Sequence, residues 1–238
     1  MVLWNGVNFT VEGREPQTAG EFYDIGLHSW NSAQYRPAAP FFLEHAAARG
    51  HAAAAELLGH VYFLDRDYAK AVPWLRQSPG SRRAAYYLGC LYQQGCPQAG
   101  IAQSFDTAAE WYRQAVSLGE PEAALALGDL YLERLLPLSR APMAHALEYF
   151  LTAAQQGHPY GQFRAAEVYR TLYEDLDRAT EFYERCLANP ARQNHSLNNL
   201  MTLQSQAALG QIRSTQTYRN LQLRRDTVNP PPPQNYSY

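Results

Sequence analysis

The side chains that most often carry catalysis or bind metal ions are scattered along this chain. Its 7 histidines form no HxxxH or HExxH motif, and its cysteines, Cys90, Cys96 and Cys186, form no CxxC pair. His45 and His51 come nearest to a pair, but they straddle an expected helix end. Because a metal site needs ligands that converge, we expect no metal ion and no cofactor.

Motifs of nucleophilic and phosphate chemistry are also missing from the sequence. It contains no GxSxG, no P-loop and no GxGxxG after a strand. The adjacent carboxylates Glu174 and Asp175 suit the start of a helix, where the helix dipole stabilises negative charge. The sequence therefore predicts a protein that is not an enzyme. The alternative is an enzyme whose site lies outside the repeats described below, which a truncation to residues 19–190 would inactivate without unfolding.

Composition favours helix, and the charge is unevenly distributed. Val and Ile are scarce, whereas Ala, Leu and Tyr dominate. The net charge is −2, but residues 1–190 are acidic and residues 191–238 carry five arginines and one acid. An acidic surface repels phosphate, which argues against nucleic acid as the main ligand. Binding through the basic C-terminal part remains an alternative, and steep salt dependence would reveal it.

A Leu-Gly-x-x-Tyr motif recurs and sets the elements that must position any site. It begins at Leu58, Leu88 and Leu127. The equivalent small positions are Gly26, Gly59, Gly89, Gly128 and Ala166, spaced by 33, 30, 39 and 38 residues. Periods of this size predict stacked helical hairpins that bind rather than transform their ligands. Longer turns at 95–104 and 135–141 account for the two long spacings.

Each small position should lie in the first helix of a pair. The second helix carries apolar residues at helical spacing, most clearly in 105–112 and 176–183. A glycine inside a helix costs about 1 kcal/mol relative to alanine. Its recurrence at one phase predicts that the second helix packs closely against the backbone of the first.

These patterns predict an all-α protein, an α-solenoid of stacked antiparallel helix pairs. We expect an irregular, hairpin-like lead-in at 1–18 and about five helix-turn-helix repeats at 19–190. C-terminal capping helices should follow at 191–225, and then a disordered Pro-rich tail at 226–238, which could alternatively bind an SH3-type or WW-type groove. No apolar run is long enough to span a membrane and no secretory signal is visible, so we expect a cytoplasmic protein.

The segments 111–119 and 124–131 carry the clearest family signature. Over residues 19–190 the pattern resembles the Sel-one-like repeat, a longer relative of the tetratricopeptide repeat (TPR). The glycine-valine turn of that family is absent after the first helix, and the second repeat is nearer to TPR length. The resemblance implies an adaptor or scaffold of the TPR/Sel-one-like superhelix type, whose concave face holds a protein or peptide.

In that frame, the groove-facing positions lie six and three residues before the small position and one and four after it. The predicted partner-binding residues are Tyr23, Leu27, Trp30, Glu56, His60, Phe63, Arg83, Tyr86, Cys90, Gln93, Glu122, Leu125, Asp129, Leu132, Tyr160, Phe163, Glu167 and Arg170. Aromatic and acidic side chains predominate, which suits a basic or amphipathic protein segment. Within this class, an adaptor and a bacterial immunity protein that neutralises a secreted effector are alternative roles.

Overall fold

A computed structural model describes residues 2–4, 9–11, 14–133, 135–136 and 141–228. It divides the chain into two compact units, Met1–Ser139 and Arg140–Tyr238. A single elongated array was expected from the repeat period, so the division is a difference from that prediction. The boundary falls in the longer turn at 135–141, where the strict helix-to-helix spacing is interrupted.

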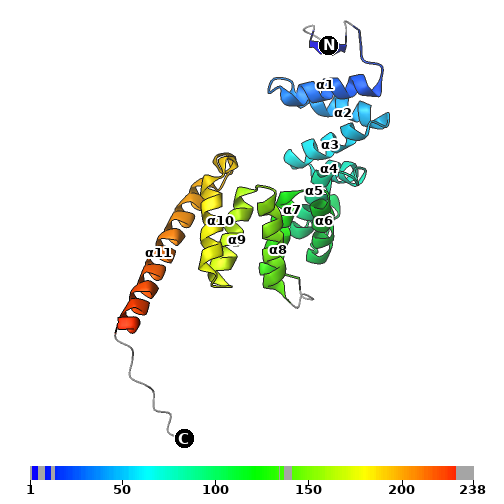
Figure 1. Ribbon diagram of the computed structural model, residues 1–238. Coiled ribbons are helices and arrows are strands. Elements are labelled where there is room, and N and C mark those ends of the chain that lie inside the picture. The colour runs from blue at the N-terminus through cyan, green and yellow to red at the C-terminus, as the bar shows by residue number, and fades with distance from the viewer. Residues whose placement is uncertain (1, 5–8, 12–13, 134, 137–140, 229–238) are drawn as a thin grey trace. The chain divides into compact units, whose positions relative to one another are not determined.

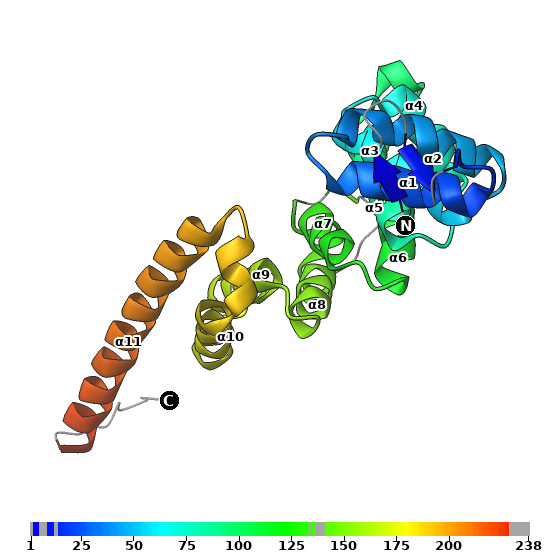
Figure 2. The same ribbon diagram turned by 90° about the horizontal axis from the view of Figure 1, so that it is seen from above.

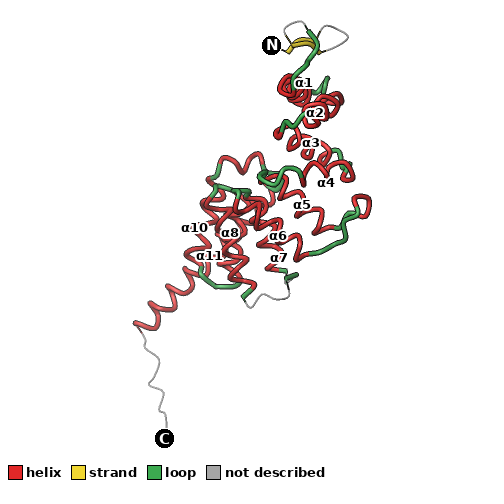
Figure 3. Tube along the Cα trace, turned by 90° about the vertical axis from the view of Figure 1, so that its right-hand side faces the viewer, coloured by secondary structure: helices red, strands yellow, loops and turns green. Residues whose placement is uncertain are grey.

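Unit 1 begins with a small β-hairpin and continues as helices, each of which packs against the next (Figures 1 and 3). Strands β1 (Val2–Trp4) and β2 (Phe9–Val11) pair antiparallel, with Val2 opposite Val11. The helices are α1 (Ala19–Asn31), α2 (Ala39–Ala48), α3 (Ala52–Leu64), α4 (Tyr68–Arg76), α5 (Arg82–Gln94), α6 (Phe105–Ser117) and α7 (Pro121–Leu132), with 3-10 turns η1 (Arg36–Ala38) and η2 (Pro97–Ala99).

The recurring glycines lie where the second helix of a pair meets the first. A Cβ added at Gly26 would lie 2.6 Å from Leu43 Cδ2 of α2, and one at Gly59 would lie 2.7 Å from Leu75 Cδ2 of α4. At Gly89 the obstacle is the Tyr112 ring of α6. The prediction of close packing at these positions is confirmed, and it explains why glycine is kept despite its cost in a helix.

Helix ends are marked by short polar side chains and by glycine. Thr18 and Glu21 form a reciprocal capping box at the start of α1, in which each side chain binds the other residue's backbone N–H. The Ser81 and Ser104 hydroxyls accept the corresponding first-turn N–H bonds of α5 and α6. Gly119 follows α6 with a φ of +85°, a left-handed conformation that glycine adopts without a Cβ clash.

The longer turn at 95–104 is part of the core of unit 1. Cys96 and Ile101 form an antiparallel bridge around η2, and both are buried. The η2 turn packs against α4. This insertion therefore closes the side of a helix pair instead of forming a free loop.

The described part of unit 2, residues 141–228, contains four helices and one 3-10 turn. They are α8 (Pro142–Gln155), α9 (Pro159–Thr171), α10 (Leu176–Ala188), η3 (Pro190–Asn194) and α11 (Asn198–Val228). The small position Ala166 of α9 is fully buried, as are Phe150 of α8 and Tyr183 of α10, and α9 packs against both α8 and α10. Met201 on α11 is also fully buried.

One long helix, α11, follows η3, where several capping helices were predicted over 191–225. It has 31 residues, and it continues to Val228, inside the range 226–238 that was predicted to be a disordered tail. Residues 229–238 lie outside the described part of the chain. Among the described side chains of α11, which run to Leu221, the last buried one is Ile212, and beyond it Gln216 still hydrogen-bonds Asp177 of α10. Figures 1 and 2 show the helix diverging from α10 along its length.

Candidate functional site

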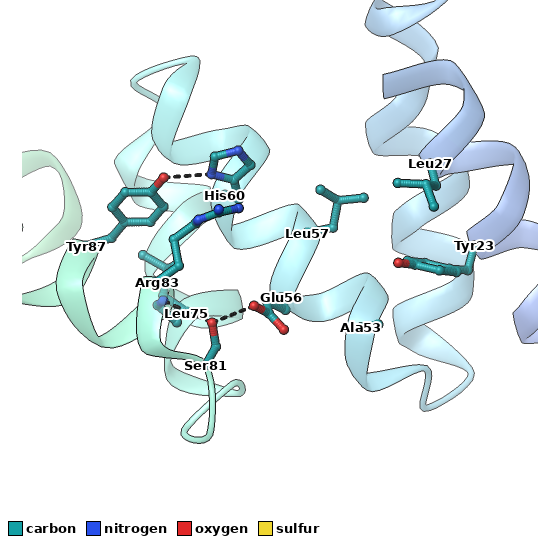
Figure 4. A pocket seen from close by; sticks show the side chains of 11 residues that line it. Tyr23, Leu27, Ala53, Glu56, Leu57, His60, Leu75, Ser81, Arg83 and Tyr87 are labelled. Atoms are coloured by element: carbon teal, nitrogen blue, oxygen red, sulfur yellow. Dashed lines mark hydrogen bonds between the residues drawn. The ribbon is translucent and has the colours of Figure 1, made fainter. Parts of the chain in front are cut away.

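A cavity of unit 1 lies between the first helices of successive pairs. It has a volume of about 230 Å³ and is open to solvent on one side. The lining residues are Tyr23 and Leu27 of α1, Ala53, Glu56, Leu57 and His60 of α3, Leu75 of α4, and Ser81, Arg83, Ala84 and Tyr87 at and within α5. Figure 4 shows these side chains converging from α1, α3 and α5. One wall is aromatic and aliphatic, and the other is polar.

The carboxylate of Glu56 is fixed at the polar wall. The Ser81 hydroxyl donates a hydrogen bond of 2.7 Å to Glu56 Oε1. The same hydroxyl accepts the backbone N–H of Ala84 at 3.2 Å and so caps α5. Because one serine serves both helices, Glu56 is held in register with the start of α5.

His60 is a half-buried, neutral side chain in this cavity. Its Nδ1 shares a hydrogen bond of 2.7 Å with the Tyr87 hydroxyl, and the two rings stack with centroids 5.7 Å apart. Burial lowers the pKa of His60, and the nearby positive charge of Arg83 lowers it further. Burial also raises the pKa of Tyr87 to about 12. The pair therefore contributes polar but uncharged groups at neutral pH.

Arg83 supplies the positive charge of the cavity. Its side chain extends from α5 toward α3 (Figure 4) and is exposed. Among the described residues, no hydrogen bond or ion pair engages its guanidinium. Its neighbour Arg82 instead forms an ion pair with Glu120 at the start of α7, in which Arg82 Nε lies 3.5 Å from Glu120 Oε2. A planar guanidinium with five donors suits a carboxylate or a backbone carbonyl of a ligand.

The acidic residues at the start of α7 and within it lie outside the cavity. Burial, and then hydrogen bonding with Glu122, raises the pKa of Glu120 to about 7. Glu122 and the half-buried Asp129 lie on α7 and do not line the cavity. The predicted acidic face of the groove thus does not extend continuously from α3 to α7 within this cavity.

Some predicted groove residues line the cavity, and others pack inside unit 1. Tyr23, Leu27, Glu56, His60 and Arg83 line it. The remaining aromatic and polar positions make internal contacts: Trp30 lies under the Arg36 guanidinium, Phe63 stacks on Tyr87 at 3.9 Å, Tyr86 lies against Tyr112, and Gln93 accepts a hydrogen bond of 2.6 Å from the Tyr112 hydroxyl. Phe63 thereby joins one helix pair to the next, whereas Tyr86 and Gln93 join the two helices of their own pair, α5 and α6.

In unit 2 the predicted groove residues face their own chain. Phe163 is only 5% exposed and is therefore a core side chain rather than an accessible anchor. Tyr160 stacks on the His195 ring, with centroids 5.6 Å apart. Glu167 accepts hydrogen bonds from Arg170 and from the Tyr183 hydroxyl. Side chains of α11 lie opposite Glu167 and Arg170 across a cavity of about 200 Å³.

Sequence reasoning missed Tyr87, Leu57 and Ser81 as lining residues. Tyr86 and Tyr87 are consecutive, and neighbouring residues on a helix point about 100° apart, so the offset frame selected the wrong one for this cavity. The signal that would have identified Tyr87 is its hydrogen bond to His60 across two helices, which no spacing within one repeat encodes.

The remaining chemical candidates have local structural roles. The His51 ring caps α3, and His45 Nδ1 lies 2.8 Å from the Phe41 carbonyl oxygen. Asp175 caps α10. Within the described ranges, no group of three His, Cys, Asp or Glu side chains could hold a metal ion. In the same part of the chain, none of the helices has the length and apolar character needed to cross a bilayer.

Comparison of the sequence with family profiles and with curated proteins gives no match. Among solved structures, a Sel1 repeat protein from Oxalobacter formigenes aligns over 74% of this chain and 73% of its own, with 22% identity and a TM-score of 0.61. A protective antigen of uropathogenic Escherichia coli with a Sel1-like repeat fold aligns over 74% of this chain, with 20% identity and a TM-score of 0.63. The alignment spans 39% of that antigen.

These likenesses define the class of the fold. The chain has the all-α, helix-pair architecture of Sel1-like and TPR-like repeat solenoids, and the predicted fold class is confirmed. An immunity protein of Pseudomonas aeruginosa also aligns, with 18% identity, but its TM-score of 0.46 is too low to support an argument about function.

Proposed function

We propose that the protein is a non-catalytic scaffold that binds a protein or peptide segment in the cavity formed by α1, α3 and α5. The observation that carries the proposal is a free guanidinium, that of Arg83, beside an apolar wall in an open cavity. A cavity of about 230 Å³ accommodates one or two side chains rather than a cofactor. Repeat solenoids also present such surfaces preformed, which lowers the ordering cost of binding.

The ligand segment is amphipathic. An apolar side chain fits between Tyr23, Leu27 and Leu57, where burial of aromatic and aliphatic surface supplies most of the affinity. Polar or charged groups of the same segment meet Arg83 and Glu56 on the opposite wall. The sequence pattern suits a basic or an amphipathic segment; a purely basic one would satisfy Glu56 but repel Arg83, so the amphipathic alternative suits the cavity better.

A peptide-display selection tests this proposal. Random peptides would be selected on the immobilised full chain, and the affinities of the selected peptides would be measured by titration calorimetry. Tyr23→Ala combined with Arg83→Gln should weaken binding by about tenfold or more, because an anchor and a charged contact are both lost. The matched control is Leu64→Gln, which changes an exposed apolar residue of α3 outside the cavity.

Measuring helicity of the same variants distinguishes a loss of binding contacts from a loss of folding. Both variants should keep the far-ultraviolet circular dichroism of the native chain, since Tyr23 is half-buried and Arg83 is exposed. If peptides that bind the native chain bind the double variant equally well, the cavity is not the binding surface and the proposal fails.

Adaptor and immunity roles both use this kind of surface and differ in the partner. An immunity protein holds a single effector in a tight complex and protects the cell that makes it. An adaptor binds its partners reversibly and more weakly. Capture from the native host, followed by identification of the partner and measurement of its affinity, separates the two. The free thiols of Cys90, Cys96 and Cys186 support the proposal of a reducing, cytoplasmic compartment.

A further inference from the structure

Unit 2 contains an open cleft between α11 and the end of α9 with the turn that follows it. Two adjoining cavities, of about 290 and 200 Å³, form this cleft, and both are lined by Arg170 of α9 and Gln211 of α11. Leu176, Ile212 and two alanines supply the apolar part of the lining. The rest of the lining is polar, so the cleft offers hydrogen-bonding and charged groups as well as apolar surface.

Glu174 and Arg219 line the larger cavity and have no partner among the described residues. Within the described side chains of residues 141–221, every other Asp, Glu and Arg makes an ion pair or a hydrogen bond inside unit 2. Arg170, for example, lies 3.0 Å from Glu167 and also donates a hydrogen bond to the Tyr183 hydroxyl. Glu174 and Arg219 form no ion pair with each other either. Two unpartnered charges of opposite sign therefore line the same cavity.

The side-chain amides of Gln204 and Gln211 also have no partner among the described residues. These two residues of α11 are one helix face apart by seven positions, which corresponds to about 10.5 Å along the axis. An extended polypeptide advances about 3.3 Å per residue, so it covers this distance in about three residues. Each amide offers both a donor and an acceptor, which suits the N–H and C=O groups of a peptide main chain.

The charges of the cleft balance, because two arginines, Arg170 and Arg219, line it together with two glutamates. A phosphate-rich or uniformly charged ligand would therefore gain no net attraction. A free zwitterion would occupy only part of a cleft that runs from Gln204 to Arg219, roughly 22 Å along α11. An extended segment of about seven residues covers that length. With one basic and one acidic side chain, it would meet both unpartnered charges.

We propose that the cleft between α9 and α11 binds an extended peptide segment of a partner protein that carries one basic and one acidic side chain. The basic side chain pairs with Glu174, and the acidic one pairs with Arg219. Gln204 and Gln211 hydrogen-bond the main chain of the segment. The cleft lies within unit 2, so it is a second site that does not depend on the function proposed for the cavity of unit 1.

Peptides of defined charge test the proposal. Each would have about seven residues and carry a fluorophore. One set would contain one Lys and one Asp, in both orders and at varied separations, in an uncharged frame of Ser, Thr and Val. Control peptides would keep the frame of the tightest-binding member and carry two Lys, two Asp or no charge. Anisotropy titrations with the full chain would give the dissociation constants.

The tightest mixed-charge peptide should bind about tenfold more tightly than the uncharged one, because each exposed ion pair contributes a factor of about three to five. Its affinity should fall as salt rises. Glu174→Gln and Arg219→Gln should each weaken binding by about three- to fivefold. Glu181→Gln, which changes an exposed carboxylate of α10 outside the cleft, should leave the dissociation constant unchanged.

Charge reversal separates direct contact from an indirect structural effect. Arg219→Glu makes both unpartnered charges acidic, so this variant should prefer the two-Lys peptide to the mixed-charge peptide. The proposal is wrong if the preference does not change, if no mixed-charge peptide binds saturably, or if charged and uncharged peptides bind equally. Displacement of the peptide by an equimolar amount of free glycine would also overturn it, because the occupant would then be a small zwitterion.

Discussion

Substituting Gly89 by alanine tests the packing principle on which the whole fold depends. An alanine Cβ at this position would lie 2.5 Å from Tyr112 Cδ1 and 3.0 Å from its Cζ. The ring cannot move aside easily, because Tyr112 is 1% exposed and its hydroxyl donates a hydrogen bond of 2.6 Å to Gln93. Either α6 must shift away from α5, or the hydrogen bond must break.

Two opposing effects set the magnitude. Alanine is favoured over glycine inside a helix by about 1 kcal/mol. Overpacking a well-filled core costs about 1–3 kcal/mol. The expected net effect of Gly89→Ala is a loss of about 1–2 kcal/mol in the free energy of unfolding, because the rigid ring brings the overpacking cost toward the upper end of its range. In a chain of this size, that corresponds to a fall of roughly 3–6 °C in the unfolding midpoint.

Two further glycines provide graded controls. At Gly59 the nearest atom is the flexible end of the Leu75 side chain, so Gly59→Ala should cost less than Gly89→Ala. At Gly210 the Cβ meets nothing, so Gly210→Ala should stabilise the protein by about 0.5–1 kcal/mol. Urea titration followed by circular dichroism at 222 nm would rank the variants. If Gly89→Ala stabilises the protein as much as Gly210→Ala does, close helix packing is not the reason why glycine recurs at the same position of successive repeats.

Three other measurements test the structure. The pKa of Glu120 is raised to about 7, so between about pH 4.5 and 7 the folded protein binds more protons than the unfolded chain. The stability that this carboxyl group contributes is therefore present at pH 4.5 and lost as pH rises through 7. Urea titrations at pH 5 and pH 8 would measure the loss, and Glu120→Gln should abolish it. Thr18→Ala removes the hydroxyl that accepts the Glu21 N–H and should lower the unfolding free energy by about 1 kcal/mol. Burial raises the pKa of the Cys90 and Cys186 thiols, so both should react slowly with a disulfide reagent until the protein unfolds, and rapid labelling of the native chain would contradict their burial.

The helix-pair architecture could be predicted because the same local sequence pattern recurs in successive repeats. A glycine at a constant phase within an amphipathic segment has few explanations other than close helix packing, and three such positions are pressed against Leu43, Leu75 and Tyr112. The division into two units could not be predicted, since the period continues through residues 135–141 with only a lengthened turn. Several capping helices were expected over 191–225, and the sequence did not indicate that one continuous helix, α11, forms there instead.

The candidate site was only partly predictable for a different reason. Offsets within one repeat identify the face of a helix, and that face contains Tyr23, Glu56, His60 and Arg83. They do not show which of those side chains a neighbouring repeat covers. Phe63 was expected to face a ligand, but it stacks on Tyr87 of the next pair at 3.9 Å. Such contacts depend on the rise from one repeat to the next, which the sequence of a single repeat does not encode.

The aromatic side chains of the first helices in unit 1 therefore serve two purposes that compete. Phe63 and Tyr87 bridge successive helix pairs, and the surface that they bury with one another cannot be buried again by a ligand. Binding energy must then come from what the bridges leave open, which is Tyr23 with its aliphatic neighbours and the free guanidinium of Arg83. Because the bridging rings also fix the spacing between α3 and α5, they hold Arg83 at a set distance from the apolar wall. Affinity in this protein should consequently depend more on that spacing than on the number of aromatic residues along the groove.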